Sequence, residues 1–151
     1  MTQTPAPRTV LFPGSFAPFT KGHASLVGRA LGLFDKVVIA IGFNAAKQSA
    51  ANVEERIAEI SAIYASEPRV SVMAYSGLTV DACKAEGAGW MLRGVRTVAD
   101  FEYERNLADL NRMISGIETV ILFTLPELAA VSSSAVRELK SHGYDVSSML
   151  P

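Results

Sequence analysis

The chain has 151 residues, the usual size of one domain, and we expect residues 1–151 to form a single domain. Hydrophobic residues make up 49% of it and charged residues 19%, which excludes an intrinsically disordered protein. The formal net charge of −1 provides no overall attraction to nucleic acid or to an anionic membrane, so neither is an expected partner. A few well-placed side chains must therefore hold any phosphate group that the protein binds.

Cysteine content and the first residues indicate the compartment. Cys83 is the only cysteine, which excludes an internal disulfide and fits a reducing environment. Residues 1–8 are polar and proline-rich, without the apolar stretch of a secretory signal. No apolar run approaches the roughly 18 residues that a membrane span needs. We expect a cytoplasmic protein.

Short apolar runs alternate with segments of helical periodicity along the chain. A run that stops at Pro13-Gly14 predicts the first strand, and the near-continuous apolar run at 36–42 predicts a strand covered on both faces. In chain order we expect strands at residues 9–12, 36–42, 69–74, 90–92 and 119–124, and helices at 21–34, 52–65, 79–86, 98–114 and 132–141. The helix at 98–114 is marked by apolar residues at helical spacing: Val98, Phe101, Leu107, Leu110 and Ile114.

Strands that alternate with helices pair in parallel through right-handed crossovers. The pattern therefore predicts an α/β fold with a doubly wound five-stranded parallel sheet of the Rossmann-like type. In such sheets ligands bind beyond the carboxyl ends of the strands, near the switch in strand order. Residues that directly follow predicted strands are thus the candidates for a functional site.

The segment after the first strand carries the strongest chemical signal. Gly14 allows a sharp turn and a close approach to a ligand, and Ser15 offers a hydroxyl group. Thr20 is a good N-cap for the next helix, whose unpaired N–H groups favour an anion. His23 would lie in the first turn of that helix and point toward bound phosphates. A lone histidine is more often a surface side chain, but the strand, glycine turn and helix around it favour the functional interpretation.

Three further clusters follow later strands. Lys47 comes after the second strand, where it is either a phosphate ligand or a solvated surface lysine. Arg93 and Arg96 flank a glycine after the fourth strand and form either a phosphate-binding fork or an exposed loop. Serines 132–134 open the last helix, as simple caps or as an anion or ribose site. On the long helix, Asp100 and Glu102 are interpreted as a solvated face paired with Arg105 and Arg112.

The pattern His/Thr-x-Gly-His in this setting resembles the nucleotidyltransferase superfamily. With the other clusters, the chain from about residue 10 to 151 resembles bacterial phosphopantetheine adenylyltransferases. The matching segments are PGSFAPFTKGH, the lysine of NAAK, VEER, GLTVDA, LRGVRTVADFEYE, LNR and VSSSAVREL.

The resemblance implies a Rossmann-like nucleotidyltransferase fold and one reaction of coenzyme A biosynthesis. ATP and 4′-phosphopantetheine would give dephospho-coenzyme A and pyrophosphate, with Mg²⁺ assisting, by direct in-line attack without a covalent intermediate. Coenzyme A would act as a product-like inhibitor, and the family implies a homohexamer. The two histidines and one cysteine are too few and too separated for a transition-metal site, so no protein metal ligand is expected.

The resemblance also implies roles for individual residues. His23 would be catalytic and would also contact ATP. The phosphopantetheine site would comprise Ser15, Lys47, Thr79 and Arg93. The ATP site would comprise Ser15, Phe16, His23, Gly94, Val95, Arg96, Glu104, Leu128, Ala129, Ala130, Val131, Ser132, Ser133 and Ser134.

The chain departs from the family pattern at two places. Ala17 stands where the family usually has aspartate, and Leu128-Ala129-Ala130 replaces a stretch that often carries an aromatic residue. Two alternatives stay open: a related transferase that uses CTP or another acceptor, and a non-catalytic nucleotide-binding homologue, which Ala17 alone motivates. Trp90 and Cys83 are expected to be packing residues, and His142 to be solvated.

Overall fold

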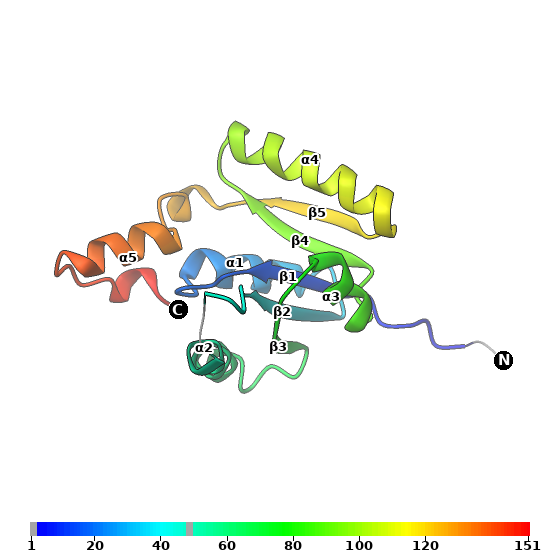
Figure 1. The fold of residues 1–151 in the computed structure, drawn as a ribbon, viewed down its shortest axis with the longest axis horizontal. Coiled ribbons are helices and arrows are strands. Elements are labelled where there is room, and N and C mark those ends of the chain that lie inside the picture. The colour runs from blue at the N-terminus through cyan, green and yellow to red at the C-terminus, as the bar shows by residue number, and fades with distance from the viewer. Residues whose placement is uncertain (1–2, 48–49) are drawn as a thin grey trace.

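The computed structural model describes residues 3–47 and 50–151. They form a parallel sheet of five strands in the order β3-β2-β1-β4-β5 with helices between the strands (Figure 1). The predicted α/β fold with a doubly wound parallel sheet is confirmed. The strands are β1 (Thr9–Gly14), β2 (Lys36–Gly42), β3 (Val70–Tyr75), β4 (Trp90–Val95) and β5 (Glu118–Phe123). The helices are α1 (Lys21–Ala30), α2 (Ala50–Ile63), α3 (Thr79–Ala85), α4 (Val98–Ser115) and α5 (Ser133–Ser141), with 3-10 turns η1 (Pro126–Leu128) and η2 (Ser147–Met149).

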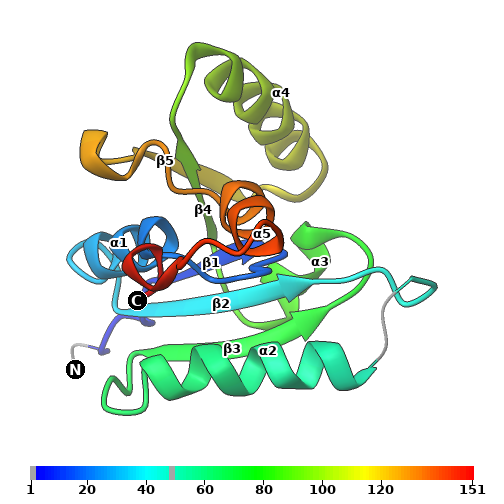
Figure 2. The same cartoon turned by 90° about the vertical axis from the view of Figure 1, so that its left-hand side faces the viewer.

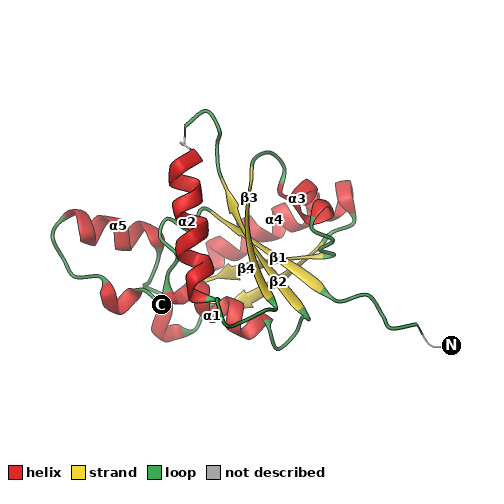
Figure 3. Ribbon diagram, turned by 90° about the horizontal axis from the view of Figure 1, so that it is seen from below, coloured by secondary structure: helices red, strands yellow, loops and turns green. Residues whose placement is uncertain are grey.

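The helices cover the sheet from two sides. The chain runs outward from β1 to β3, then crosses back to β4 on the other side of β1, so right-handed crossovers place α1 and α2 on one face and α3 and α4 on the other. Figure 3 shows α1 and α2 on one side of the sheet and α3 and α4 on the other. Strand order therefore switches between β1 and β4, where a binding crevice is expected in this class of fold.

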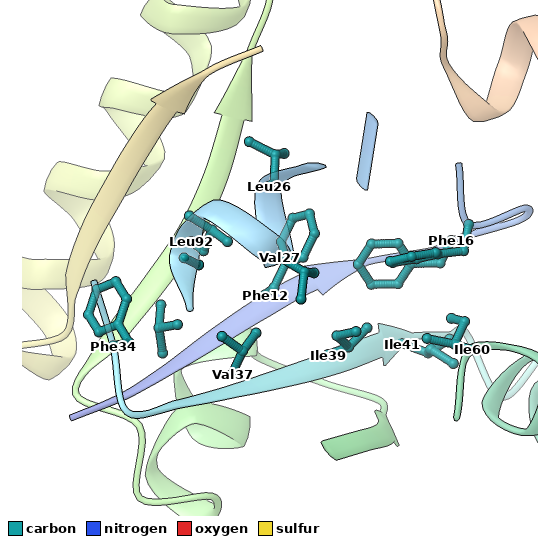
Figure 4. Close-up of a cluster of buried hydrophobic side chains, with 13 residues drawn as sticks. Phe12, Phe16, Leu26, Val27, Phe34, Val37, Ile39, Ile41, Ile60 and Leu92 are labelled. Carbon is teal, nitrogen blue, oxygen red and sulfur yellow. The ribbon is translucent and has the colours of Figure 1, made fainter. Parts of the chain in front are cut away.

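Two apolar clusters form the core, one on each face of the sheet. The larger cluster joins β1 and β2 to α1 and α2, and extends from Phe34 at one end to Phe16 and Ile60 at the other (Figure 4). The smaller cluster joins the opposite face of the same strands to α3 and includes Cys83. β2 is buried from Val37 to Ile41, which confirms the prediction that this strand is covered on both faces.

The residues expected to have structural roles fit those roles. Cys83 is fully buried, and burial raises the pKa of its thiol to about 11. Trp90 packs against Phe34 with ring centroids 5.6 Å apart. His142 is exposed, as predicted for a solvated side chain. No helix within residues 3–47 and 50–151 is long and apolar enough to cross a membrane.

Several element boundaries differ from the sequence prediction by one or two residues; β1, for example, continues through Pro13-Gly14, where the sequence predicted its end. Two boundaries differ by more. β4 does not break at Arg93-Gly94 but continues to Val95, because its backbone pairs with β5 through that point. A glycine does not interrupt a strand whose neighbour holds its backbone extended. The first helix ends at Ala30 instead of residue 34, and the chain turns before β2.

The apolar stripe of α4 points away from the core. Tyr103, Leu107, Leu110 and Ile114 recur at helical spacing, and their exposed fractions are 63%, 36%, 47% and 53%. Glu104 is the only α4 residue that is buried. The apolar periodicity therefore predicted the helix correctly, but these residues do not pack against the sheet as such a stripe usually does.

Candidate active site

A cavity of about 230 Å³ lies at the switch between β1 and β4. The loop after β1, the end of β4 and the start of α5 surround it, and Figure 2 shows α5 beside the ends of the central strands. The lining residues are Phe12, Pro13, Gly14, Phe16, Thr20, Gly22, His23, Leu26, Arg93, Gly94, Arg96, Thr124, Val131, Ser132 and Ser133.

A second cavity of about 420 Å³ adjoins the first. Pro13, Gly14 and Arg93 line both cavities, so the end of β1 and one β4 side chain form the boundary between them. Two ligands bound in these cavities would meet at this boundary. The other lining residues of the second cavity are Ser15, Gly42, Tyr75, Gly77, Leu78, Thr79, Val80, Met91, Glu104, Leu107, Ala108, Asn111 and Thr119.

His23 is held in one orientation by the start of α1. The Thr20 backbone N–H donates to His23 Nδ1 at 2.9 Å, and the His23 backbone N–H donates to Thr20 Oγ1 at 3.4 Å, which completes a capping box. Because Nδ1 accepts a hydrogen bond, the proton of the neutral ring is on Nε2. The ring is enclosed by Phe12, Phe16 and Phe19, with centroids 6.1, 5.0 and 5.4 Å away.

The surroundings of His23 keep its ring neutral. Burial, and secondarily the positive charge of Arg93, lower the pKa of His23 from 6.5 to about 4. At neutral pH the side chain therefore acts through a neutral Nε2–H donor and not as a cation. The residue lines the first cavity, where such a donor suits a phosphate oxygen.

Arg93 is fixed by three hydrogen bonds. Its Nε and Nη2 donate to the two carboxylate oxygens of Glu104 at 2.9 and 2.7 Å, and its Nη1 donates to the carbonyl of Pro13 at 2.9 Å. Glu104 is 6% exposed and the Arg93 side chain 31%, so the pair is anchored on the buried carboxylate. This geometry orients the guanidinium at the boundary between the cavities. Glu104 lines the second cavity and does not line the first. It therefore lies apart from most of the other residues that we expect to contact ATP.

Arg93 and Arg96, which follow each other closely in the sequence, have different partners. Arg96 is exposed beyond the strand end. Its Nε lies 3.7 Å from Asp100 Oδ2, and its Nη1 donates to the carbonyl of Ala129 at 3.3 Å. The sequence paired Asp100 with Arg105 or Arg112, whereas the structure pairs it with Arg96. Arg112 instead lies near Asp109 and Glu118. The two arginines of the motif thus have separate surroundings, although both line the first cavity.

The start of α5 forms one wall of the first cavity. Ser132 is the N-cap, its side chain accepting from the Ala135 N–H at 3.1 Å, and Ser133 Oγ donates to the carbonyl of Pro18 at 2.7 Å. Val131, Ser132 and Ser133 line the cavity, where the helix N-terminus favours an anion. The structure does not place five of the expected ATP contacts in either cavity: Val95, Leu128, Ala129, Ala130 and Ser134.

The remaining candidates divide between the cavities and the surface. Ser15 and Thr79 line the second cavity, and the Thr79 hydroxyl lies 2.8 Å from the Tyr75 hydroxyl. Lys47 is exposed in the turn after β2 and lines neither cavity. Val95 is 2% exposed and its side chain is part of the interior. The sequence reasoning missed Tyr75 and Asn111; Tyr75 ends a strand, which was an available signal.

The cavity residues do not fit a protein-bound metal ion. Within the described part of the chain, no three His, Cys, Asp or Glu side chains gather in a metal-binding group. Glu104 is the one carboxylate among the residues that line the two cavities, and Arg93 occupies both of its oxygens. A metal ion here would depend on ligands that a substrate supplies.

Comparison with known proteins agrees with this geometry. The family model for cytidylyltransferase-like proteins matches residues 11–139, which include both cavities. The chain belongs to this nucleotidyltransferase family.

Relatives over nearly the whole chain give a narrower assignment. A phosphopantetheine adenylyltransferase of Porphyromonas gingivalis is 55% identical over 93% of this chain and 92% of its own length. Those of Phocaeicola vulgatus and Bacteroides fragilis are 51% and 48% identical, over 95% of this chain and 95% and 96% of their own. The protein is an enzyme of the phosphopantetheine adenylyltransferase family, as the motifs of the sequence predicted.

Proposed function

We propose that the enzyme transfers the adenylyl group of ATP to 4′-phosphopantetheine and releases dephospho-coenzyme A and pyrophosphate. One observation carries the proposal: two adjoining cavities share Pro13, Gly14 and Arg93, so two phosphorylated substrates can meet beside His23. The first cavity, with the helix N-terminus of α5, suits ATP. The larger second cavity suits the pantetheine arm, with Thr79 on its wall.

The reaction proceeds by direct in-line displacement. A phosphate oxygen of phosphopantetheine attacks the α-phosphorus of ATP at the shared boundary, the new P–O bond forms, and the bond to the β-phosphate oxygen breaks to release pyrophosphate. The His23 Nε2–H and the guanidinium of Arg93 stabilise the charge on the α-phosphoryl oxygens. Ser132 and Ser133, which line the cavity, already cap α5 and bond to the loop after β1, so they are not nucleophiles poised beside a base.

Other contacts follow from the family resemblance. Lys47 and Arg93 bind the phosphate of phosphopantetheine, and ATP contacts Phe16, the Gly94–Arg96 turn and the start of α5. Mg²⁺ would assist by neutralising phosphate charge, and the phosphate oxygens of ATP and water would be its ligands, because the one carboxylate that lines the cavities, Glu104, is paired with Arg93. Coenzyme A contains both the adenylyl part and the phosphopantetheine part of the product, so it competes for the same cavities. The single buried Cys83 fits an enzyme of the reducing cytoplasm.

Pyrophosphate release tests the assignment. Purified protein is given Mg²⁺ and ATP with and without 4′-phosphopantetheine, and both pyrophosphate and dephospho-coenzyme A are measured. We expect release only with the acceptor, and with ATP far better than with CTP. Preference for CTP or for another acceptor would support the related transferase. Binding of ATP without release would support the non-catalytic homologue.

We also propose that the enzyme assembles as a homohexamer through the exposed stripe of α4. Tyr103, Leu107, Leu110 and Ile114 present a row of apolar side chains that a monomer would leave in water, and a second copy of the chain would cover it. Light scattering after size-exclusion chromatography tests this. Leu110→Glu should reduce the mass toward that of the monomer. Arg105→Glu, on the polar flank of the same helix, is the matched control and should leave the mass unchanged.

A further inference from the structure

The turn that follows β1 contains a strained residue at the edge of the first cavity. Phe16 has a backbone φ of 48°, in the left-handed region that non-glycine residues rarely adopt. Such a conformation is strained and persists only where the surroundings impose it. The Phe16 ring is 2% exposed and packs edge-on to Phe12 and His23, with centroids 5.1 and 5.0 Å away.

Two arginines from distant elements hold the carbonyl groups on either side of Phe16. Arg56 of α2 donates through Nη1 to the carbonyl of Ser15 at 2.7 Å. Arg137 of α5 donates through Nη1 to the carbonyl of Ala17 at 2.5 Å. These arginines lie within the VEER and VSSSAVREL segments, neither of which gave them a role in the sequence interpretation. Together they tie the turn to α2 and α5.

These bonds also fix where the backbone donor of the turn points. The Ser15–Phe16 peptide is trans, so its C=O and N–H point in opposite directions. With the carbonyl held toward α2, the Phe16 N–H is directed away from α2. Phe16 lines the first cavity, and its N–H has no hydrogen-bond acceptor among the described backbone and side-chain bonds of the turn. It is therefore available for a phosphate oxygen.

We propose that Arg56 and Arg137 are positioning residues for adenylyl transfer. By holding the carbonyls of Ser15 and Ala17 they keep Phe16 in its strained conformation. That conformation directs the Phe16 N–H toward ATP and keeps the Phe16 ring against His23. Loss of either arginine lets the turn relax, which displaces both groups, although neither arginine itself lines the two cavities. This inference rests on the proposed function, because it assigns the two arginines to that reaction.

The variants Arg56→Gln and Arg137→Gln test the proposal in the full-length enzyme. We expect kcat to fall about tenfold to hundredfold, because small misplacements of positioned groups have effects of that size, while the dissociation constant of ATP changes less than threefold. Arg56→Lys and Arg137→Lys should recover part of the lost kcat, since an ammonium group still donates to a carbonyl. The double glutamine variant should lose less than the product of the single losses, because both arginines act on one turn.

Arg69→Gln is the matched control. Arg69 also donates through Nη1 to a backbone carbonyl, that of Leu31, but it precedes β3 at the opposite end of the sheet. We expect its kcat to equal that of the wild type. Equal kcat values for Arg69→Gln and the two glutamine variants would overturn the proposal, as would lysine variants no more active than the glutamine variants.

A readout without substrate separates this inference from the proposed function. The pKa of His23, followed by NMR, should lie at about 4 in the wild type and rise toward 6.5 when the Phe16 ring no longer shields it. A rise in both glutamine variants supports the positioning role even if the wild type makes no dephospho-coenzyme A. An unchanged pKa of His23 in both variants would show that the arginines do not hold the turn. Failure of the proposed function would appear separately, as a wild type without turnover.

Discussion

His23 provides the sharpest test of the proposed chemistry. Replacing it with alanine removes the Nε2–H donor from the first cavity and the acceptor that Nδ1 presents to the Thr20 N–H. Replacing it with glutamine keeps the capping box, because glutamine at this helix position can accept from the N-cap N–H, and it retains an N–H donor at a different point. The two variants therefore separate the structural contribution of the side chain from its catalytic one.

The expected magnitudes differ for the two contributions. Loss of one preorganised donor to a transition-state oxygen costs about 10²–10³ in kcat, or roughly 3–4 kcal/mol. Loss of a capping acceptor costs about 1 kcal/mol of stability. His23→Ala should thus lose two to three orders of magnitude in kcat at a modest cost in stability, with the dissociation constant of ATP changed little. His23→Gln should unfold at the wild-type temperature and turn over at an intermediate rate.

Acid pH offers an independent measurement on the same residue. The pKa of His23 is lower in the folded protein, about 4, than its ordinary value of 6.5, so the unfolded chain binds the extra proton first as the pH falls. Stability is therefore lost between pH 6.5 and 4, by up to roughly 3 kcal/mol at about 1.4 kcal/mol for each pH unit. His23→Gln should lack this loss. In the wild type, kcat should not depend on the charge of His23 above about pH 5.

The assays are pyrophosphate release under saturating substrates, calorimetric ATP binding, and denaturant unfolding across the pH range. A kcat for His23→Ala within tenfold of the wild type would refute the donor role. An acidic limb of kcat with a pKa near 6.5 that disappears in His23→Gln would show that the ring is an ordinary, solvated histidine. The first result would remove His23 from the proposed mechanism, and the second would show that the fold does not keep its ring neutral.

Three further substitutions test the framework of the site by denaturant unfolding. Arg93→Met should lower the free energy of unfolding by about 3 kcal/mol, because it leaves the buried Glu104 carboxylate unpaired, and Glu104→Gln should cost less. Gly94→Ala places a methyl group 2.5 Å from Leu26 Cδ1, which should cost about 1–3 kcal/mol; Leu26→Ala should then cost less in that background than in the wild type. Gly116→Ala should cost about 1 kcal/mol, because Gly116 ends α4 with a φ of 75°. Equal costs for Arg93→Met and Glu104→Gln, additivity of the Gly94 and Leu26 changes, or a neutral Gly116→Ala would contradict the respective interpretation.

Local patterns in the sequence were sufficient for much of the fold. The continuous apolar run of β2 predicted a strand covered on both faces, because only a central strand can bury every side chain. The Thr20-x-Gly-His pattern predicted a helix start at the correct residue, because Thr20 and His23 satisfy each other's backbone groups within one turn. The motif after β1 was expected beyond the carboxyl end of a strand, and its residues line the two cavities there.

Patterns that depend on a neighbour were interpreted less well. The sequence predicts the end of β4 at Leu92, because a glycine after an arginine suggests a turn. Pairing with β5 keeps the strand extended to Val95. The apolar residues of α4 were correctly taken as helical, but periodicity does not say whether an apolar face meets the sheet or another molecule. The sequence left Arg93 and Arg96 either as a phosphate-binding fork or as an exposed loop, and it gave no indication of their partners, which come from elsewhere in the chain.

The sequence by itself determined the fold class, the family and the segments that form the site. The tertiary structure decided how the charged side chains are used. Glu104 takes both carboxylate bonds of Arg93, and Arg56 and Arg137 reach carbonyl groups 41 and 120 residues away in the chain. The physical reason is that strand and helix propensities act over a few residues, whereas the partner of a guanidinium depends on strand order, which brings distant loops to one edge of the sheet.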